Sequence, residues 1–126
     1  CLYDTYARGR EIIDFGCAVA IASNYNPGSA PCPSMPFTIS LACRRLGFSP
    51  AEAITASTFN AACALRLQDR IGSIEVGKQA DIQLLDCYDE RELAWHVAAG
   101  SPLLVAIQGE IVHLLTDGEM EVEEET

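Results

Sequence analysis

Histidine and basic residues are scarce in this sequence. Its 126 residues include only two histidines, His96 and His113, which lie far apart in the chain. A self-contained zinc site of histidine and cysteine is therefore not expected. Lysine and arginine total 8, against 18 aspartates and glutamates, which gives a formal net charge of −10. Because the basic residues form no cluster, nucleic acid is not an expected partner.

Long apolar runs and paired cysteine motifs are also missing. No apolar stretch reaches the ~20 residues that a membrane-spanning helix needs, so no membrane partner is expected. The six cysteines show no CxxC spacing, and several fall within apolar patterns. This indicates reduced thiols that fill the core of a cytoplasmic protein. They are Cys1, Cys17, Cys32, Cys43, Cys63 and Cys87.

The sequence does contain enough apolar material for a folded core. Hydrophobic residues make up 49% of the chain and charged residues 21%, and the length corresponds to about one domain. Six of the 18 acidic residues fall within residues 117–126. We expect this last stretch to be an acidic disordered tail.

The first part of the sequence predicts an α/β arrangement. Residues 3–15 carry the spaced apolar side chains of a helix, which Gly16 would end. Residues 17–23 are almost continuously apolar and predict a buried strand of a parallel sheet. A loop rich in turn-forming residues follows at residues 24–33.

Two helices with clear start signals come next. Ser34 can cap a helix that has Pro36 in its first turn and ends at Gly47. Ser49 opens the capping-box pattern SPAE, with proline at the first helical position. This pattern predicts a helix that continues to about residue 65.

The later part of the sequence is richer in strand patterns. Residues 82–85 predict a strand and residues 90–98 a short helix, and residues 103–107 and 111–115 predict two strands of a hairpin. The pattern changes at residues 69–71, which marks a boundary. Neither half looks complete, because a single parallel strand cannot form a sheet.

The segment GSIEVGKQADIQLLD at residues 72–86 resembles a motif of the amidohydrolase superfamily. In that superfamily the chain leaves a metal-dependent (β/α)8 barrel at this motif and returns to a small β-sandwich. The motif is specific for the superfamily and does not indicate a substrate.

A second set of segments is more selective. They are similar to the region around strand eight of the barrel in the imidazolonepropionase family, which opens an imidazolone ring in histidine degradation. The likeness covers about residues 7–115. The segments are NYNPGS at 24–29, SMP at 34–36, LAC at 41–43, TFNAA at 58–62 and REL at 91–93.

The resemblance implies an α/β fold that is the C-terminal fragment of a larger enzyme. Residues 1–69 would form the last part of the (β/α)8 barrel, with helix seven, strand eight and the helices that follow. Residues 70–116 would form the β-sandwich return segment, before the tail at residues 117–126. A whole barrel takes ~250 residues, and the family's metal-binding histidines would lie upstream. Zinc or iron would be bound by the full-length enzyme, with none expected in this fragment alone.

The resemblance also implies where the catalytic aspartate of the family would stand. That aspartate ligates the metal and takes a proton from the attacking water. Asn24 occupies its position, and an amide has no useful basicity and only a weakly ligating oxygen. Asn24 is therefore the candidate catalytic and metal-binding residue, in a weakened form. The alternative is that Asn24 only caps the strand end through a side-chain bond to the backbone.

The loop after Asn24 supplies the candidate substrate-binding residues. Pro27 and Gly28 fit the central positions of a type II turn, a reading that requires neither Asn26 nor Ser29. By the resemblance, Asn26, Gly28 and Ser29 contact the substrate, a small polar ring with an acidic side chain. Glycine at this place would let the backbone approach a ligand closely.

The expected function is hydrolysis of 4-imidazolone-5-propanoate to N-formimino-L-glutamate by the full-length enzyme, which could form a homodimer. The isolated chain is expected to be inactive, because it lacks metal ligands. Two alternatives stay open: another cyclic amidohydrolase or a deaminase of the same superfamily, and a degenerate copy without catalytic activity. For Trp95, His96 and His113, packing or surface placement is the favoured interpretation.

Overall fold

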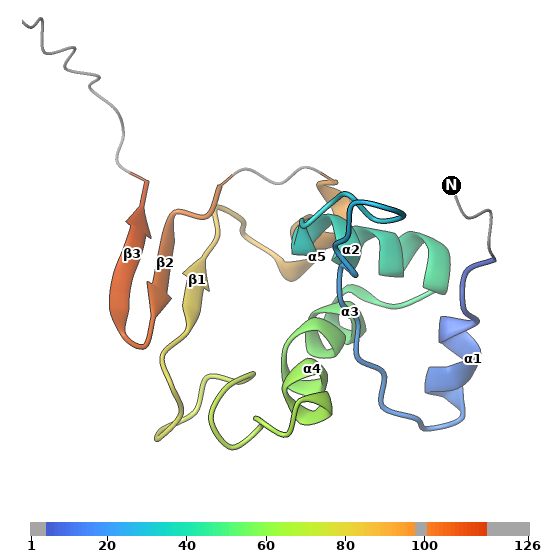
Figure 1. Cartoon of the computed structure of the whole chain (residues 1–126), viewed down its shortest axis with the longest axis horizontal. Helices are drawn as coiled ribbons and strands as arrows, with labels where there is room; N and C mark the ends of the chain where they lie inside the picture. Colours follow the sequence, from blue (N-terminus) through green and yellow to red (C-terminus); the bar gives the residue numbers. More distant parts are fainter. Residues whose placement is uncertain (1–4, 98–100, 116–126) are drawn as a thin grey trace, which may run out of the picture.

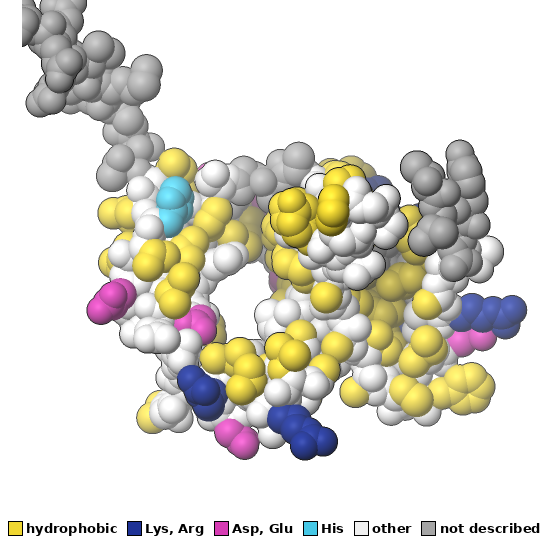
Figure 2. Space-filling model, in the orientation of Figure 1, with side chains coloured by type: hydrophobic (Ala, Val, Ile, Leu, Met, Phe, Trp, Pro, Cys, Tyr) yellow, Lys and Arg dark blue, Asp and Glu magenta, His cyan; other side chains and the backbone are white. Residues whose placement is uncertain are grey.

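The computed structural model describes residues 5–97 and 101–115. Within these ranges the helices gather in one part of the molecule, and a three-stranded sheet stands beside them (Figure 1). A space-filling view shows an opening between the sheet and the helices (Figure 2). The helical part carries the candidate loop, so its construction is described first.

Helix α1 (Gly9–Asp14) is shorter than predicted but ends where glycine was expected. Gly16 adopts a left-handed φ of 81°, and its N–H donates to the carbonyl of Ile13 at 2.8 Å. Such a residue satisfies the last carbonyls of a helix without the steric cost that a side chain would bring. The prediction that Gly16 ends this helix is confirmed.

Helix α2 (Met35–Leu41) begins as its cap predicted, and the Ser34 hydroxyl accepts a hydrogen bond from the backbone N–H of Phe37. The chain then continues as a π-helix, η1 (Ala42–Leu46), which the sequence did not reveal. The expected stop at Gly47 is confirmed, since this residue has a left-handed φ of 73°.

The predicted helix over residues 50–65 is broken into α3 (Pro50–Ser57) and α4 (Phe59–Ala64). Its start is confirmed, because Ser49 and Glu52 form both bonds of a capping box. The break has a local cause. The hydroxyls of Ser57 and Thr58 both donate to the carbonyl of Ile54, at 2.9 and 2.8 Å. Side chains that bond nearby carbonyls in this way compete with helical hydrogen bonding.

The core lies among α2, η1, α3 and α5 (Glu90–Trp95). Four of its six buried members are alanines, which let the elements approach one another closely, and Ile39 and Phe48 are the larger members. Val19 and Ile21 pack against it from the extended segment at residues 17–23. The buried members of this core cluster are Ile39, Ala42, Phe48, Ala53, Ala56 and Ala94.

The sheet contains β1 (Ile82–Leu84), β2 (Leu104–Ile107) and β3 (Glu110–Leu114), all antiparallel and in that order. The predicted hairpin is confirmed. Its two linking residues, Gln108 and Gly109, have φ values of 55° and 84°, as the tight turn between twisted antiparallel strands requires.

The prediction of a buried parallel strand at residues 17–23 is wrong. This segment runs extended beside the helices (Figure 1) but pairs with no strand among the described residues. Two hydrogen bonds connect it to the helices that follow. The Ile21 N–H donates to the Ala56 carbonyl at 3.1 Å, and Asn60 Nδ2 donates to the Val19 carbonyl at 2.9 Å. Val19 and Ile21 are half-buried, whereas Ala18, Ala20 and Ala22 are exposed. The described residues therefore cover one face of the segment and supply no neighbouring strands.

The expectation that the cysteines fill the core is also wrong. All five described cysteines are free thiols, but Cys17 and Cys63 are exposed and the others are only half-buried. Burial raises the pKa of the Cys43 thiol. Apolar surroundings in the sequence did not become burial, because elements such as the segment at residues 17–23 have only one covered face.

Large apolar surfaces are uncovered, as expected for incomplete layers. Phe15 is 85% exposed at the end of α1, and β3 exposes Ile111, Val112 and Leu114. Isolated exposed apolar residues are ordinary, but a whole strand of them marks a surface that fits a partner. No described helix is long and apolar enough to cross a membrane. The predicted tail at residues 117–126 lies outside the described residues.

Candidate functional site

The candidate site is the loop at residues 24–30, which joins the extended segment to the cap of α2. Its ends are held together by an isolated bridge between Asn26 and Ala30, in which the Asn26 N–H donates to the Ala30 carbonyl at 3.0 Å. The loop is therefore a closed corner of the helical part.

Asn24 lies exposed at the entrance of this corner with a φ of 51°. A left-handed backbone is uncommon outside glycine, and asparagine and aspartate tolerate it best. The side-chain amide of Asn24 has no hydrogen-bond partner among the described residues. The alternative in which this side chain caps the strand end is therefore not found. Instead, the neighbouring Ser23 hydroxyl accepts the N–H of Tyr25 at 3.3 Å.

Asn26 organises the rest of the loop. Its Oδ1 accepts from the N–H of Gly28 at 3.0 Å, the N–H of Ser29 at 2.8 Å and the Ser29 hydroxyl at 3.3 Å. Its Nδ2 donates to the carbonyl of Asn24 at 2.7 Å. The structure thus brings Asn26, Gly28 and Ser29 together and ties them to the backbone of Asn24.

The type II turn predicted at Pro27 and Gly28 is wrong. A type II turn needs a positive φ at its third residue, and Gly28 does not adopt one. The bonds to Asn26 Oδ1 shape the turn instead, in the manner of an Asx turn. Glycine is still favoured on grounds of space, because a Cβ at Gly28 would lie 3.3 Å from Asn26 Oδ1.

The described residues do not by themselves fit a zinc or iron site. Among residues 5–97 and 101–115, no group of three or more His, Cys, Asp or Glu side chains could hold a metal ion. Asn24 offers one neutral amide oxygen, whereas such metals are held in proteins by thiolate, imidazole or carboxylate groups. We therefore assign these residues no metal-dependent step.

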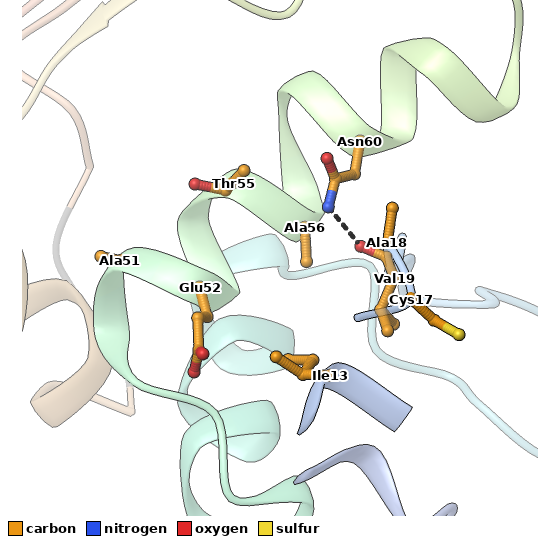
Figure 3. Close-up of a pocket in the computed structure, with 9 residues that line it drawn as sticks. All are labelled: Ile13, Cys17, Ala18, Val19, Ala51, Glu52, Thr55, Ala56 and Asn60. Atoms are coloured by element: carbon orange, nitrogen blue, oxygen red, sulfur yellow. Dashed lines mark hydrogen bonds between the residues drawn. The ribbon is translucent and has the colours of Figure 1, made fainter. Parts of the chain in front are cut away.

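A shallow apolar hollow of about 250 Å³ lies at the other end of the extended segment (Figure 3). Two of its polar side chains already have partners. Asn60 donates to the Val19 carbonyl, and Glu52 binds Arg10. The hollow therefore offers mainly packing surface, with the exposed free thiol of Cys17 at its edge. It is lined by Ile13, Cys17, Ala18, Val19, Ala51, Glu52, Thr55, Ala56 and Asn60.

The sequence indicates Asn60 only as part of the family segment TFNAA at residues 58–62 and does not predict its structural role. Its side chain is the link between α4 and the extended segment (Figure 3). An asparagine inside a predicted helix carries no signal that distinguishes such a long-range bond from an ordinary surface amide.

The remaining candidates have structural contacts elsewhere. Trp95 is 71% exposed at the end of α5, where the Arg44 guanidinium lies 5.4 Å from the centre of its ring. His113 is in β3, with its Nε2 3.1 Å from the Pro102 carbonyl oxygen. These contacts agree with the expectation of packing or surface placement for both residues.

Comparisons with known proteins show which family the chain resembles. The model of the amidohydrolase family matches residues 5–119. The imidazolonepropionase of Symbiobacterium thermophilum is 43% identical over 113 residues, which are 89% of this chain and 27% of that protein. The imidazolonepropionase of Bacteroides thetaiotaomicron is 47% identical over 112 residues, with the same coverage.

A solved structure agrees on the fold. The crystal structure of an amidohydrolase from Thermotoga maritima superposes with a TM-score of 0.67 at 24% identity, over 84% of this chain and 25% of that one. The chain spans about a quarter of the length of the relatives that it matches. With the family model covering most of its residues, the chain belongs to the amidohydrolase family.

Proposed function

We propose that the protein containing this chain hydrolyses 4-imidazolone-5-propanoate to N-formimino-L-glutamate. The observation that carries the proposal is the 40–50% identity to several imidazolonepropionases over 76–89% of the chain. In this reaction water adds to the ring carbonyl and the ring C–N bond breaks. The released nitrogen takes a proton, and the carbonyl carbon becomes a carboxylate.

The proposed layout follows the expected division of the chain. Residues 1–69 would contribute the last part of a (β/α)8 barrel, residues 70–116 the returning part of a β-sandwich, and residues 117–126 a tail. The single covered face of residues 17–23 and the exposed strand β3 support this layout, since both have apolar surface that further layers would cover. The solved relative, only 25% of which is covered by this match, has room for those layers.

The loop supports binding of a small polar substrate. Gly28 and Ser29 are exposed, so a ligand can reach the backbone and the hydroxyl on the outside of the turn. Asn24 is exposed, with an amide free to donate to or accept from a ring carbonyl or ring N–H. We therefore assign Asn24 to the reacting ring, and Gly28 and Ser29 to the rest of the substrate.

Asn24 cannot supply the general base that the reaction needs at this position. A neutral amide cannot accept the proton of an attacking water at ordinary pH, so a base at this position is missing. The proposal includes zinc or iron as cofactor, a place in histidine degradation, a cytoplasmic location and a homodimeric full-length protein. The ligands of the metal would have to come from residues other than those described.

The deciding experiment is an assay of the whole protein with imidazolone propionate, and in parallel with dihydroorotate as another cyclic amide. We expect ring opening of the first and none of the second. Turnover of dihydroorotate alone would favour another amidohydrolase. Absence of any turnover, in a protein that binds its metal, would favour a degenerate copy and overturn the proposal.

A further inference from the structure

Lys78 is the only lysine in the sequence, and its side chain is held in place by three neighbours. Its Nζ donates to the Ser73 hydroxyl and lies 3.0 Å from Glu75 Oε1. The same nitrogen lies 5.5 Å from the centre of the Phe59 ring, and the side chain is only 12% exposed. Two residues of its own turn therefore fix the ammonium over an aromatic ring of α4.

The turn at residues 72–78 also touches α4 through its backbone. A Cβ at Gly72 would lie 2.7 Å from Ala62 Cβ and 3.1 Å from Phe59 Cα, so the main chain of Gly72 lies directly against the helix. A cation within about 6 Å of an aromatic ring is attracted to its face, more strongly where water is excluded. The turn thus rests on α4 at two points, Gly72 and Lys78.

The residue that follows Phe59 contacts a different part of the molecule. Asn60 Nδ2 donates to the Val19 carbonyl at 2.9 Å (Figure 3). Val19 belongs to the extended segment at residues 17–23, which leads into the candidate loop at residues 24–30. Because Phe59 and Asn60 are consecutive, a shift of the first turn of α4 would displace the donor that holds this segment.

We infer that Lys78 is a positioning residue, which holds the first turn of α4 through Phe59 and thereby fixes the extended segment through Asn60. It acts on the candidate loop from a distance and supplies no group to the reaction. The consequence for substrate binding rests on the proposed function. The consequence for the order of residues 17–23 does not.

The test compares local hydrogen exchange in the whole protein and in two Lys78 variants. Lys78→Met keeps an apolar stem and removes the charge. We expect the backbone amides of residues 17–23 to exchange about threefold faster or more, the size of a lost cation–π contact, with α2 (Met35–Leu41) unchanged. Lys78→Arg should restore the slow exchange, because a guanidinium also stacks on an aromatic ring.

Kinetics in the same proteins report on the loop. In Lys78→Met, KM for imidazolone propionate should rise about threefold or more while kcat falls less, because the displaced loop binds the substrate through Gly28 and Ser29. Lys78→Arg should keep both constants. Arg70→Met is the matched control, since it removes a positive charge from the same connecting segment, where Nη2 lies 3.5 Å from Gln79 Oε1. It should change neither exchange nor KM.

If Lys78→Met does not yield folded protein, Phe59→Leu takes its place, because it removes the ring and keeps an apolar side chain. Unchanged exchange at residues 17–23, or an equal increase there and in α2, would overturn the inference. Faster exchange with KM unchanged in an active protein would overturn the effect on the loop. If the whole protein does not turn over imidazolone propionate, the proposed function fails, and the exchange pattern alone decides the role of Lys78.

Discussion

Arg10 and Glu52 join α1 to the first turn of α3 through a bidentate ion pair. Arg10 Nη1 lies 2.9 Å from Glu52 Oε2, and Nη2 lies 3.1 Å from Oε1. The same carboxylate accepts the backbone N–H of Ser49 at 2.8 Å as part of the capping box. One side chain thus links a helix start, a long-range ion pair and the packing of the helical part.

This pair predicts a loss of stability in acid. The hydrogen bonds from Arg10, and then the N–H of Ser49, lower the pKa of Glu52 from 4.5 to about 2. Because the folded pKa is the lower one, the stabilisation is fully present above about pH 4.5 and is lost as the pH falls towards 2. The denaturant midpoint of the unsubstituted chain, measured from pH 6 to pH 2, should therefore decrease between about pH 4.5 and pH 2.

Glu52→Gln should make that part of the pH dependence disappear. Asp14→Asn is the matched control, because it removes a carboxylate that binds the same guanidinium only through Nε, at 2.8 Å, on the exposed side of α1. An acid-induced loss of equal size in the Glu52→Gln variant would show that other carboxylates cause it.

Gly72 predicts a large effect of a single methyl group. It has a φ of 95°, and a Cβ there would lie 2.7 Å from Ala62 Cβ and 3.1 Å from both Phe59 Cα and the Thr58 carbonyl oxygen. Gly72→Ala should therefore lower the free energy of unfolding by more than the ~1–2 kcal/mol that a left-handed backbone costs an ordinary residue. Chemical denaturation measures the difference.

Gly77→Ala isolates the backbone contribution to this effect. Gly77 has a similar φ of 91°, with no atom within 4 Å of an added Cβ. It should show the conformational cost alone. Equal losses at the two positions would mean that the packing of Gly72 on α4 contributes nothing.

Asn24→Asp in the whole protein should raise the rate of ring opening by about 10²-fold, the lower end of what a positioned general base contributes. Aspartate also tolerates the left-handed backbone at this position. The gain should appear in kcat and decline at low pH as the new carboxylate is protonated. Asn24→Ala should show no such gain, and an unchanged rate in Asn24→Asp would place the base elsewhere.

The exposed apolar strand β3 predicts self-association of the isolated chain. Ile111 and Leu114 lie on the same face of the sheet, because the register pairs them with Ala106 and Leu104, which are two residues apart in β2; the two side chains are 61% and 57% exposed. Replacing both with lysine should shift the chain towards monomer at concentrations of about 10–100 μM in analytical ultracentrifugation. Glu110→Lys adds positive charge to the same strand and removes no apolar surface, so it should change association much less. Equal effects of the two changes would assign the association to charge.

Local signals in the sequence were reliable where the structure depends on local bonds. The caps at Ser34 and Ser49, the helix ends at Gly16 and Gly47 and the hairpin turn are all determined within a few residues, and all are confirmed. The amidohydrolase resemblance is confirmed as well, because the model of that family matches residues 5–119.

The wrong predictions concern hydrogen-bonding groups that are distant in the sequence, or groups that compete for the same partner within one turn. An apolar run at residues 17–23 has the composition of a strand, but pairing depends on neighbours that the described residues do not include. Two hydroxyls that share the Ile54 carbonyl break a pattern that looked like one helix. The network of Asn26 replaced a turn type that Pro27 and Gly28 alone would suggest.

The outward side chains of the extended segment are all methyl groups, from Ala18, Ala20 and Ala22. Such a surface has little depth, so a neighbouring layer can approach almost to the main chain. A larger side chain at any of the three alanines would keep such a layer at a greater distance from the main chain.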